Sequence, residues 1–371
     1  MAIVKFGDIV RDVKINVDRA NNPYEHYVAG DHMDSEDLTI HRYGSFETDD
    51  VGPAFTRIFK PGQILYGSRR TYLKKVAVAD FEGICANTTF VLESKDEALF
   101  DNRLLPFIIL SDAFTRWSIA HSKGSTNPYV LFSDLADYEF DLPPLAEQKV
   151  LADKLWAAYR LKESYKKLLT ATEEMVKSQF IEMFGDNVSK KKISDVCDVR
   201  GGSTPTRTTK EFWNNGTISW FTIEDIYEQG RYISETKQHI TELATKKCFV
   251  YPVDTVLICC TASVGEYAIT KKEMASNQQF NGMMIKDKSE LHPEYLLYVA
   301  STLKEDLLRQ AGKTTINFVS RSKLENIEIP VPPYSEQLGF VSVYRQADKS
   351  GFELRKSIEA IDQVIKSLIN N

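Results

Sequence analysis

Side chains that can donate several hydrogen bonds gather at one turn in the first half of the chain. Residues 59–78 read as two strands around a polar turn that contains Arg69 and Arg70 and is followed by Lys74. A guanidinium can donate two parallel hydrogen bonds to a carboxylate, a phosphate or the edge of a guanine, whereas an ammonium acts as a point charge. The turn is therefore a candidate binding surface, and a merely solvated turn is the alternative.

The second half of the chain carries a comparable set of polar side chains. The set comprises Ser203, Thr204, Thr206, Arg207, Ser263 and Gln278. Asn127 and, in the matching loop of the second half, Thr314 and Asn317 lie before the exit to a long helix. An Asn-Gln pair in a strand also suits backbone bracing, and the loop residues also suit turn capping, so both alternatives stay open.

Catalytic constellations are incomplete in this sequence. The run 312–314 resembles the end of a phosphate-binding loop, but Leu307 stands where the first glycine of that loop should be. Asp80, Glu93 and Lys95 have the spacing of a metal-dependent nuclease core, a pattern that is common by chance. The six histidines show no metal-ligand spacing. We expect no catalytic residue and no metal site on this chain.

Two long helices are the elements that must position these polar clusters. Residues 142–186 begin with Pro143-Pro144 and contain no further Pro or Gly until Gly185. Residues 331–371 repeat this segment without a gap, 189 positions later. Apolar and small residues at spacings of three, four and seven predict a coiled-coil seam in the first helix. The predicted seam comprises Leu151, Ala158, Leu161, Tyr165, Leu168, Thr172, Met175 and Gln179.

The repeat predicts a duplicated α+β fold. We expect a globular domain of mixed α/β character at residues 1–141 and a second one at 187–331. Long helices at 142–186 and 332–371 follow the two domains, and their copies suit an antiparallel coiled coil within one chain. The helix, loop and Pro-Pro order is the same in both halves, while the strand tips differ most. One scaffold with two different loop tips is typical of two related binding domains.

Composition limits the environment of the protein. The sequence has 371 residues with a net charge of −6, so a surface that binds a polyanion must be local. It has no run of 18 apolar residues and no secretory signal pattern at the start. Its five cysteines form no Cys-x-x-Cys pair. We expect buried free thiols and a cytoplasmic protein.

Five ordered segments of the second half carry a family resemblance. They are KISDVCDVRGGSTPTRTTKEFW, ISWFTIEDI, DTVLICCTASVGEYAI, NQQFNGMMI and GKTTINFVSRSKLENIEIPVPPYSEQ. With the duplicated domain and its Pro-Pro-x-x-Glu-Gln helix, they resemble the DNA-specificity (S) subunit of type I restriction–modification systems. The first half departs from this pattern because it lacks the Gly-Gly-Ser-Thr-Pro turn.

The resemblance implies a non-catalytic role in defence against foreign DNA. Each globular domain would be a target-recognition domain that reads one half of a split, asymmetric DNA site, and the helices would set the spacer. Two methyltransferase (M) subunits would dock on the helices and bring S-adenosylmethionine for DNA methylation. Restriction (R) subunits would add ATP- and Mg²⁺-dependent translocation and cleavage.

The resemblance also gives the polar clusters a role as DNA contacts. The predicted contacts are Tyr66, Ser68, Arg69, Arg70, Tyr72, Lys74, Asn127, Ser203, Thr204, Thr206, Arg207, Ser263, Gln278, Thr314 and Asn317. The predicted partner-docking residues are Trp156, Leu169, Phe180 and Phe184. The alternative for these four is packing on their own recognition domains.

Three other functions stay open at this stage. The chain could be the specificity subunit of another restriction class with bipartite sites, such as one resembling type IIB. It could instead be a coiled-coil scaffold without a role on DNA, which the acidic net charge favours. The third alternative is a nuclease that uses Asp80, Glu93 and Lys95.

Overall fold

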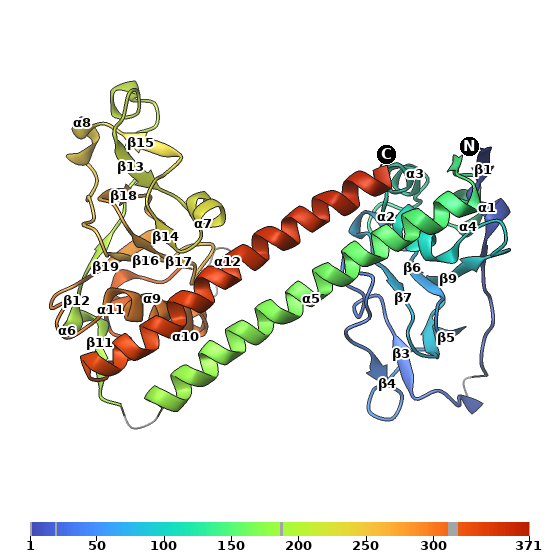
Figure 1. Ribbon diagram of the computed structural model, residues 1–371, viewed down its shortest axis with the longest axis horizontal. Coiled ribbons are helices and arrows are strands. Elements are labelled where there is room, and N and C mark those ends of the chain that lie inside the picture. Colours follow the sequence, from blue (N-terminus) through green and yellow to red (C-terminus); the bar gives the residue numbers. More distant parts are fainter. Residues whose placement is uncertain (1, 19–20, 186–187, 311–317, 371) are drawn as a thin grey trace. The chain divides into compact units, whose positions relative to one another are not determined.

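Two compact units make up the chain in this computed structural model, which describes residues 2–18, 21–185, 188–310 and 318–370. Unit 1 contains the residues up to Lys166 and those from Ser357 onward, and unit 2 contains Lys167–Lys356. Both long helices therefore contribute one part to each unit. The elements are labelled in Figure 1.

Unit 1 is built from short strands and helices that precede the first long helix. Its strands are β1 (Ala2–Lys5), β2 (Val10–Asp12), β3 (His26–Val28), β4 (Gly44–Ser45), β5 (Phe55–Phe59), β6 (Ile64–Gly67), β7 (Val76–Val78), β8 (Gly83–Ala86), β9 (Thr89–Ser94) and β10 (Glu139–Leu142). Its helices are α1 (Phe6–Ile9), η2 (Thr71–Leu73), η3 (Asn102–Leu104), α2 (Leu105–Leu110), α3 (Asp112–Ala120), α4 (Phe132–Ala136) and the start of α5 (Leu145–Phe184).

The strands of unit 1 form two four-stranded sheets and a small pair. One sheet has the order β2-β9-β6-β7, and the other has the order β4-β3-β8-β5, with β3 parallel to β8. Strand β1 pairs with β10, which returns the chain to the foot of α5. The main core lies between the first sheet and the helices, around Phe6, Phe107 and Phe114, all fully or almost fully buried.

Unit 2 repeats this order of elements. Its strands are β11 (Lys190–Lys192), β12 (Cys197–Gly201), β13 (Ile218–Phe221), β14 (Tyr232–Ile233), β15 (Gln238–Ile240), β16 (Val256–Cys259), β17 (Tyr267–Thr270), β18 (Met274–Ser276), β19 (Phe280–Ile285) and β20 (Glu328–Pro330). Its helices are α6 (Ile193–Val196), η4 (Lys210–Phe212), α7 (Ile223–Gln229), α8 (Glu242–Thr245), α9 (Pro293–Thr302), α10 (Lys304–Gln310), α11 (Arg321–Glu325) and the start of α12 (Tyr334–Asn370).

The sheet topology of unit 2 matches that of unit 1 in most strands, although the second sheet, β15-β13-β18, has no strand that corresponds to β5. The order β12-β19-β16-β17 corresponds to β2-β9-β6-β7, and β14 extends this sheet by one strand. Strand β13 runs parallel to β18, as β3 does to β8, and antiparallel to β15, as β3 does to β4. The small pair β11–β20 corresponds to β1–β10. The predicted α+β duplication is confirmed.

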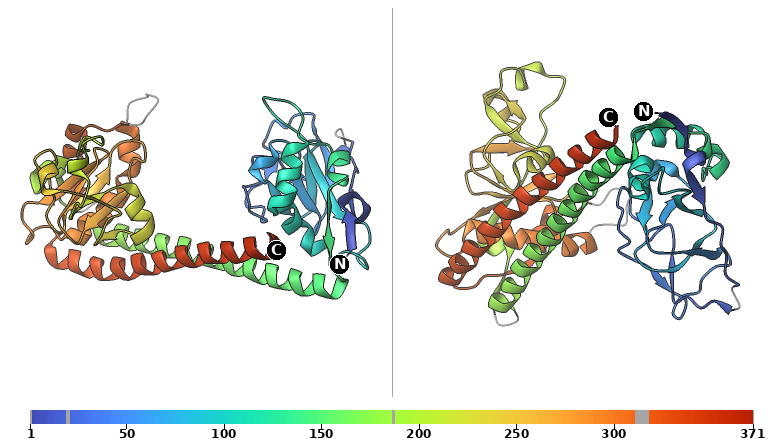
Figure 2. Two further views of the ribbon diagram at one scale, coloured as in Figure 1. Left: turned by 90° about the horizontal axis from the view of Figure 1, so that it is seen from above. Right: turned by 45° about the vertical axis from the view of Figure 1, so that its right-hand side comes forward.

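The two long helices pack side by side within each unit (Figure 2). In unit 2, Arg355 bonds Glu173 and Phe340 stacks edge-on against Phe184 at 5.7 Å. Later residues of one helix thus meet earlier residues of the other, which is the predicted antiparallel arrangement. In unit 1, Lys162 Nζ lies 2.6 Å from Asp362 Oδ1.

The predicted seam of α5 is wrong at three positions. Leu161, Leu168 and Met175 are 45%, 52% and 51% exposed. Each of the two helix segments packs on a globular domain as well as on the other helix, so its buried stripe is broader and turned relative to a two-helix seam. In unit 1 this stripe includes Leu155 and Tyr159, which join the main core.

A buried glutamine ties the start of α5 to unit 1. Gln148 is 1% exposed, and its Oε1 accepts a hydrogen bond from the Asp101 N–H at 2.9 Å. Its Nε2 donates to the carbonyls of Leu99 and Pro143 at 3.0 and 2.8 Å. The amide therefore satisfies three backbone groups that burial would otherwise leave without a partner.

The same arrangement fixes the start of α12 in unit 2. Gln337 is fully buried, and its Oε1 accepts from the His292 N–H at 2.8 Å. Its Nε2 donates to the carbonyls of Glu290 and Pro332, both at 2.8 Å. The repeated Glu-Gln dipeptide of the sequence thus marks a helix anchor.

The apolar segments 104–121 and 293–310 each form two helices. Helix α2 ends before Ser111, whose backbone is extended and whose side chain accepts a hydrogen bond from the Phe114 N–H at 3.2 Å. This serine is the N-cap of α3, so a side chain in the middle of the apolar pattern starts a new helix. Helices α9 and α10 are likewise separate, on either side of Leu303.

The five cysteines are buried and unpaired, as the sequence predicts. Burial raises the pKa of the Cys85 and Cys197 thiols to about 12 and that of Cys260 to about 11. Among the described residues, none of the helices combines the length and apolar character required to span a membrane.

Candidate nucleic-acid interface

The cationic turn of unit 1 lies against the loop that precedes α4. Arg69 and Tyr129 form an antiparallel bridge, and Arg70 Nε donates to Asn127 Oδ1 at 3.2 Å. Two segments that are about 60 residues apart in sequence therefore form one surface. The predicted residues of both loops belong to this surface.

Three predicted residues of this turn face solvent. Arg69, Arg70 and Tyr72 are exposed, and Arg70 adopts the left-handed backbone conformation with φ 52°. Within the described part of the chain, neither arginine has a carboxylate partner, so both guanidinium groups keep donors for an anion or a base edge. Asn127 is half-buried and orients Arg70.

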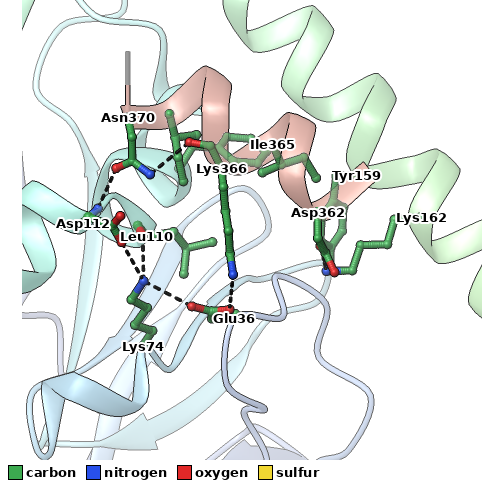
Figure 3. A pocket seen from close by; sticks show the side chains of 12 residues that line it. Glu36, Lys74, Leu110, Asp112, Tyr159, Lys162, Asp362, Ile365, Lys366 and Asn370 are labelled. Carbon is green, nitrogen blue, oxygen red and sulfur yellow. Dashed lines mark hydrogen bonds and ion pairs between the residues drawn. The ribbon is translucent and has the colours of Figure 1, made fainter. Parts of the chain in front are cut away.

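Lys74 points inward instead (Figure 3). Its ammonium lies 3.1 Å from Glu36 and 3.4 Å from Asp112, and only 17% of its side chain is exposed. Glu36 also faces Lys366 at 3.9 Å, and Asn370 Oδ1 accepts a hydrogen bond from the Asp112 N–H at 2.8 Å. Lys74 thus ties the turn to the end of α12 within unit 1.

Tyr66 and Ser68 are part of the framework of the turn. Tyr66 is 2% exposed and lies between the rings of Phe90 and Phe114, at 6.2 and 6.1 Å. Burial raises the pKa of Tyr66 to about 12. Ser68 is buried and its Oγ donates to the Thr88 carbonyl at 2.6 Å. Strand alternation turns Tyr66 into the core and leaves the residues after Gly67 to form the tip.

The corresponding turn of unit 2 has the same backbone pairing with different side chains. Thr261 and Phe318 form an antiparallel bridge that matches the one between Arg69 and Tyr129. Ser263 is exposed at the tip, which carries no charge between residues 260 and 265. Thr314 and Asn317, predicted in the adjacent loop, lie outside the described residues.

The polar turn after β12 is held tightly against the sheet. A Cβ atom at Gly202 would lie 2.2 Å from the Asn277 carbonyl oxygen and from Ser276 Oγ, so only glycine fits there. The next residue, Ser203, donates through Oγ to the Lys247 carbonyl at 2.8 Å. Ser203 is therefore a framework residue whose side chain is already satisfied.

Thr204, Thr206 and Gln278 are exposed residues of this surface. Thr204 Oγ1 donates to Gln278 Oε1, which joins two predicted contact residues from distant segments of the chain. Asn277 and Gln279 bond each other through their side chains at 2.9 Å, and the Gln279 N–H also bonds Asn277 at 2.9 Å. These bonds brace the backbone, which is the alternative that the sequence leaves open for the pair Asn277-Gln278.

Arg207 lies over two tryptophans that sequence reasoning missed. Its guanidinium carbon is 3.9 Å from the Trp213 ring centroid and 4.6 Å from that of Trp220. Its Nη1 donates to Gln238 Oε1 at 2.7 Å. The two tryptophans are seven residues apart, a helical spacing that misleads here, because Trp213 ends a 3₁₀ turn and Trp220 lies on strand β13.

An acidic cluster in unit 1 meets the geometric requirement for a metal site. Ligand atoms of Asp37, His41 and Glu163 lie within 4.8 Å of one another, and no other such group occurs in the described ranges. Lys166 Nζ lies 3.1 Å from Asp37 and 2.9 Å from Glu163, so one ammonium already pairs with both carboxylates. Burial favours a raised pKa for Asp37, but hydrogen bonds from Tyr159 and Lys166 outweigh it and lower the pKa to about 2.

The residues of the nuclease alternative serve structural contacts. Glu93 accepts hydrogen bonds from Arg11, and Lys95 donates to the Gly7 carbonyl. Asp80 is exposed and belongs to no convergent group of metal-binding side chains among the described residues. The geometry therefore gives this alternative no support.

Two of the predicted docking residues pack inside their own units. Trp156 Nε1 donates to the Arg103 carbonyl at 2.9 Å, and its ring meets Phe107 edge-on at 5.3 Å. Phe180 lies 4.7 Å from the Tyr298 ring. Both residues thus match the alternative of packing on the adjacent globular domain.

The other two docking residues are also involved in packing. Phe184 is 3% exposed, and Leu169 is half-buried, with its Cδ1 close to Gly351 of α12. By contrast, Leu168 and Met175 of the same helix segment are exposed apolar side chains seven residues apart. Residues seven apart lie on one face of a helix, so these two present an apolar strip to solvent.

Comparison with known proteins identifies the duplicated unit. The profile of the type I restriction modification DNA specificity domain matches residues 24–173 and, a second time, residues 185–362. The chain belongs to this family. Each copy of the DNA specificity domain covers most of one globular part and extends into the long helix that follows it.

Curated relatives resemble part of the chain. The type I restriction enzyme MjaIX specificity subunit of Methanocaldococcus jannaschii is 34% identical over 185 residues, which cover 49% of this chain and 42% of the relative. The EcoprrI specificity subunit of Escherichia coli is 31% identical over 152 residues, or 40% of this chain and 38% of the relative. The matches thus span less than half the length of these relatives.

Solved structures share the DNA specificity fold over almost the whole chain. The S subunit of a type I restriction–modification system from M. genitalium has a TM-score of 0.63 at 12% identity, with 99% of this chain and 94% of that chain covered. A chain from a study of complex assembly of a type I system has a TM-score of 0.50 at 19% identity, with 99% and 96% covered. At these identities the likeness concerns the fold.

Proposed function

We propose that this chain is the DNA-specificity subunit of a type I restriction–modification complex and reads a bipartite DNA site. The observation that carries the proposal is the duplication of one family domain with the same framework and different exposed loop residues. Two tethered readers turn the second half-site encounter into an intramolecular event, which raises the affinity for a split site. The closely similar backbone and dissimilar tips suit an asymmetric sequence.

The proposed recognition domains are residues 1–141 and 187–331, and the helices at 142–186 and 332–371 set the distance between half-sites. In the first domain, Arg69 and Arg70 are exposed and lack carboxylate partners among the described residues. In the second, Arg207 has the same property. Local cations of this kind allow contacts with phosphates and bases although the net charge of the chain is −6.

Exposure and internal contacts divide the predicted DNA contacts into two groups. The exposed or half-exposed candidates for direct contact are Arg69, Arg70, Tyr72, Asn127, Thr204, Thr206, Arg207, Ser263 and Gln278. The residues assigned to support of these loops are Tyr66, Ser68, Lys74 and Ser203. Thr314 and Asn317 keep their predicted role as contacts.

Catalysis is assigned to partner subunits in this proposal. Two methyltransferase subunits would dock on the helices and carry S-adenosylmethionine, and restriction subunits would supply ATP- and Mg²⁺-dependent steps, all in the cytoplasm. The exposed Leu168 and Met175 are a better candidate docking strip than Trp156, Phe180 and Phe184, because an apolar side chain in solvent gains most from burial by a partner.

The test is methylation in cells by the full chain expressed with its methyltransferase subunits. Methylome sequencing should reveal one bipartite motif with a fixed spacer. Replacing both Arg69→Ala and Arg70→Ala should relax the preference in one half-site and leave the other half unchanged. Arg116→Ala, an exposed arginine of α3 outside the turn, is the matched control and should leave the motif intact.

Two results would count against the proposal. Absence of any bipartite methylation by the assembled wild-type complex would reject the specificity function. A relaxed preference in both half-sites at once would reject the assignment of one half-site to the first domain.

A further inference from the structure

The guanidinium of Arg207 has a fixed position on the surface of unit 2. Trp213 and Trp220 meet at 5.1 Å with their rings at 87°, and Arg207 lies over both. An arginine on aromatic faces is held by cation–π attraction and by stacking of its planar group. The side chain is therefore oriented before any ligand arrives.

The loop that carries Arg207 is tied down by the same two tryptophans. Trp220 Nε1 donates to the Ser203 carbonyl at 3.3 Å, and Trp213 Nε1 donates to the Thr206 carbonyl at 3.2 Å. Each indole thus contributes its face to the guanidinium and its N–H to the backbone just before it. A backbone fixed at two points cannot easily move the arginine away.

Gln238 fixes the remaining freedom of the side chain. It lies directly opposite Trp220 in the antiparallel register of β13 and β15, so the two side chains share one face of the sheet. Gln238 Oε1 accepts from Arg207 Nη1 at 2.7 Å. This is a neutral acceptor, and it leaves the positive charge in place.

The charge of Arg207 is not compensated in the described part of the chain. Arg231, Arg345 and Arg355 of the same unit each pair with a carboxylate, at 3.0, 2.8 and 2.7 Å. Arg207 has no such partner, and only its bond to Gln238 is found there. Nε and Nη2 thus remain as donors on an oriented, exposed cation.

We propose that Arg207 reads a guanine in the half-site of the second recognition domain, with Trp213, Trp220 and Gln238 as its positioning residues. The inference rests on the proposed function. A planar, pre-oriented guanidinium suits the paired O6 and N7 acceptors of guanine in the major groove. A phosphate contact alone would need neither the double aromatic support nor the amide that sets the rotation of the group.

The test uses the full chain assembled with its methyltransferase subunits and a DNA series with every base at each position of the methylome-derived motif. Arg207→Ala should lower the preference for guanine at one position of one half-site by roughly 5- to 150-fold. Preferences in the other half-site should not change. Arg200→Ala, an exposed arginine of β12, is the matched control for charge.

A second pair of variants separates base reading from charge and from folding. Arg207→Lys should keep most of the affinity but lose the guanine preference, because an ammonium lacks the paired donors. Gln238→Ala leaves both tryptophans in place and should weaken the same preference by a smaller factor. Trp213→Leu should do so more strongly, with thermal unfolding measured alongside.

Two results would overturn the assignment of Arg207 to a guanine. If Arg207→Ala weakens binding equally for all bases and reduces the salt dependence, the residue contacts phosphate and the inference is wrong. It is also wrong if the guanine preference survives in both Arg207 variants while the wild type methylates a bipartite motif. Failure of the wild type to specify any motif would instead reject the proposed function.

Discussion

The two globular parts of this protein use one framework for different side-chain chemistry. Gln148 and Gln337 make the same three backbone bonds at the start of their helices. Two turns further along, equivalent positions differ completely. Trp156 packs on the core of unit 1, whereas Arg345 makes a two-pronged ion pair with Glu294 in unit 2. The backbone bonds of the two glutamines are the same in both copies, whereas the contacts of Trp156 and Arg345 differ.

One arginine of each unit shows the same contrast. In unit 1, Arg57 is largely covered, with 11% of its side chain exposed, and its Nη1 lies 2.9 Å from Asp12 Oδ1 and 3.0 Å from the Thr89 carbonyl. In unit 2, Arg207 lies on the surface over two indoles. Burial with a carboxylate makes an arginine a stabilising element, and exposure on an aromatic support makes it available to a ligand.

The largest expected effect on stability comes from loss of the Arg57–Asp12 ion pair of unit 1. Arg57→Met should lower the free energy of unfolding of unit 1 by about 3–5 kcal/mol, because the Asp12 side chain is only 2% exposed and would keep only Lys14, 3.9 Å away, as a cation. Arg207→Met should cost roughly 1 kcal/mol or less. Hydrogen exchange of β2 and β9 in the full chain measures the first effect. Equal losses of unfolding free energy in the two variants would contradict the contrast between Arg57 and Arg207. A second change, Asp12→Asn, should recover part of the loss from Arg57→Met.

The helix anchors should respond alike. Gln148→Ala and Gln337→Ala each remove three buried hydrogen bonds, and we expect each to destabilise its own unit by roughly 3 kcal/mol. Exchange protection in the two units gives the separate values. Clearly unequal losses would show that the framework is less similar than its geometry indicates. Gln→Glu at either position should cost at least as much, because it buries a carboxyl group and turns an acceptor oxygen towards two carbonyls.

Acid should weaken unit 1 through Asp37. The pKa of Asp37 is lowered to about 2, below the usual 3.8, by hydrogen bonds from Tyr159 and Lys166 that outweigh burial. A lowered pKa in the folded state gives stability that is complete above about pH 4 and is lost as the pH falls towards 2. The loss should be about 2 kcal/mol, and exchange in unit 1 as a function of pH measures it. Asp37→Asn should abolish this pH dependence, and a persistent one would assign it elsewhere.

The smallest effects should come from the ion pairs that join the long helices. In unit 2, the Arg355–Glu173 pair is about half exposed on both sides and should contribute roughly 0.5 kcal/mol or less. The Lys162–Asp362 pair of unit 1 is better covered and should contribute more, roughly 1 kcal/mol. Double-mutant cycles with Gln and Asn replacements, at two salt concentrations, give both values. Equal coupling energies would show that exposure does not separate them.

The sequence predicts the duplicated framework well because the repeat extends through residues with fixed structural roles. The 189-residue offset pairs Gln148 with Gln337, although the pattern does not reveal what either amide binds. The exposed positions of Arg69 and Arg70 follow from a polar turn between two strands. The same pattern predicts Tyr66 and Lys74 on this surface, whereas the structure turns both inward.

The missed features depend on contacts between segments that are far apart in the chain. Periodicity places Leu161, Leu168 and Met175 in a helix seam, but it cannot represent a globular domain that packs on the other side of the helix. The support of Arg207 requires the register of β13 and β15, which brings Gln238 opposite Trp220. A pairing register of this kind is set by tertiary structure and leaves no local signal.

The burial of all five thiols makes the protein a suitable host for site-directed labels. Buried thiols with raised pKa values, such as Cys85 and Cys197, are poor nucleophiles at neutral pH, because the thiolate is the reactive form. A single cysteine introduced at an exposed site, such as Met175, should react first with a maleimide dye. Fluorescent reporters can thus test the proposed docking of partners without removal of the native cysteines.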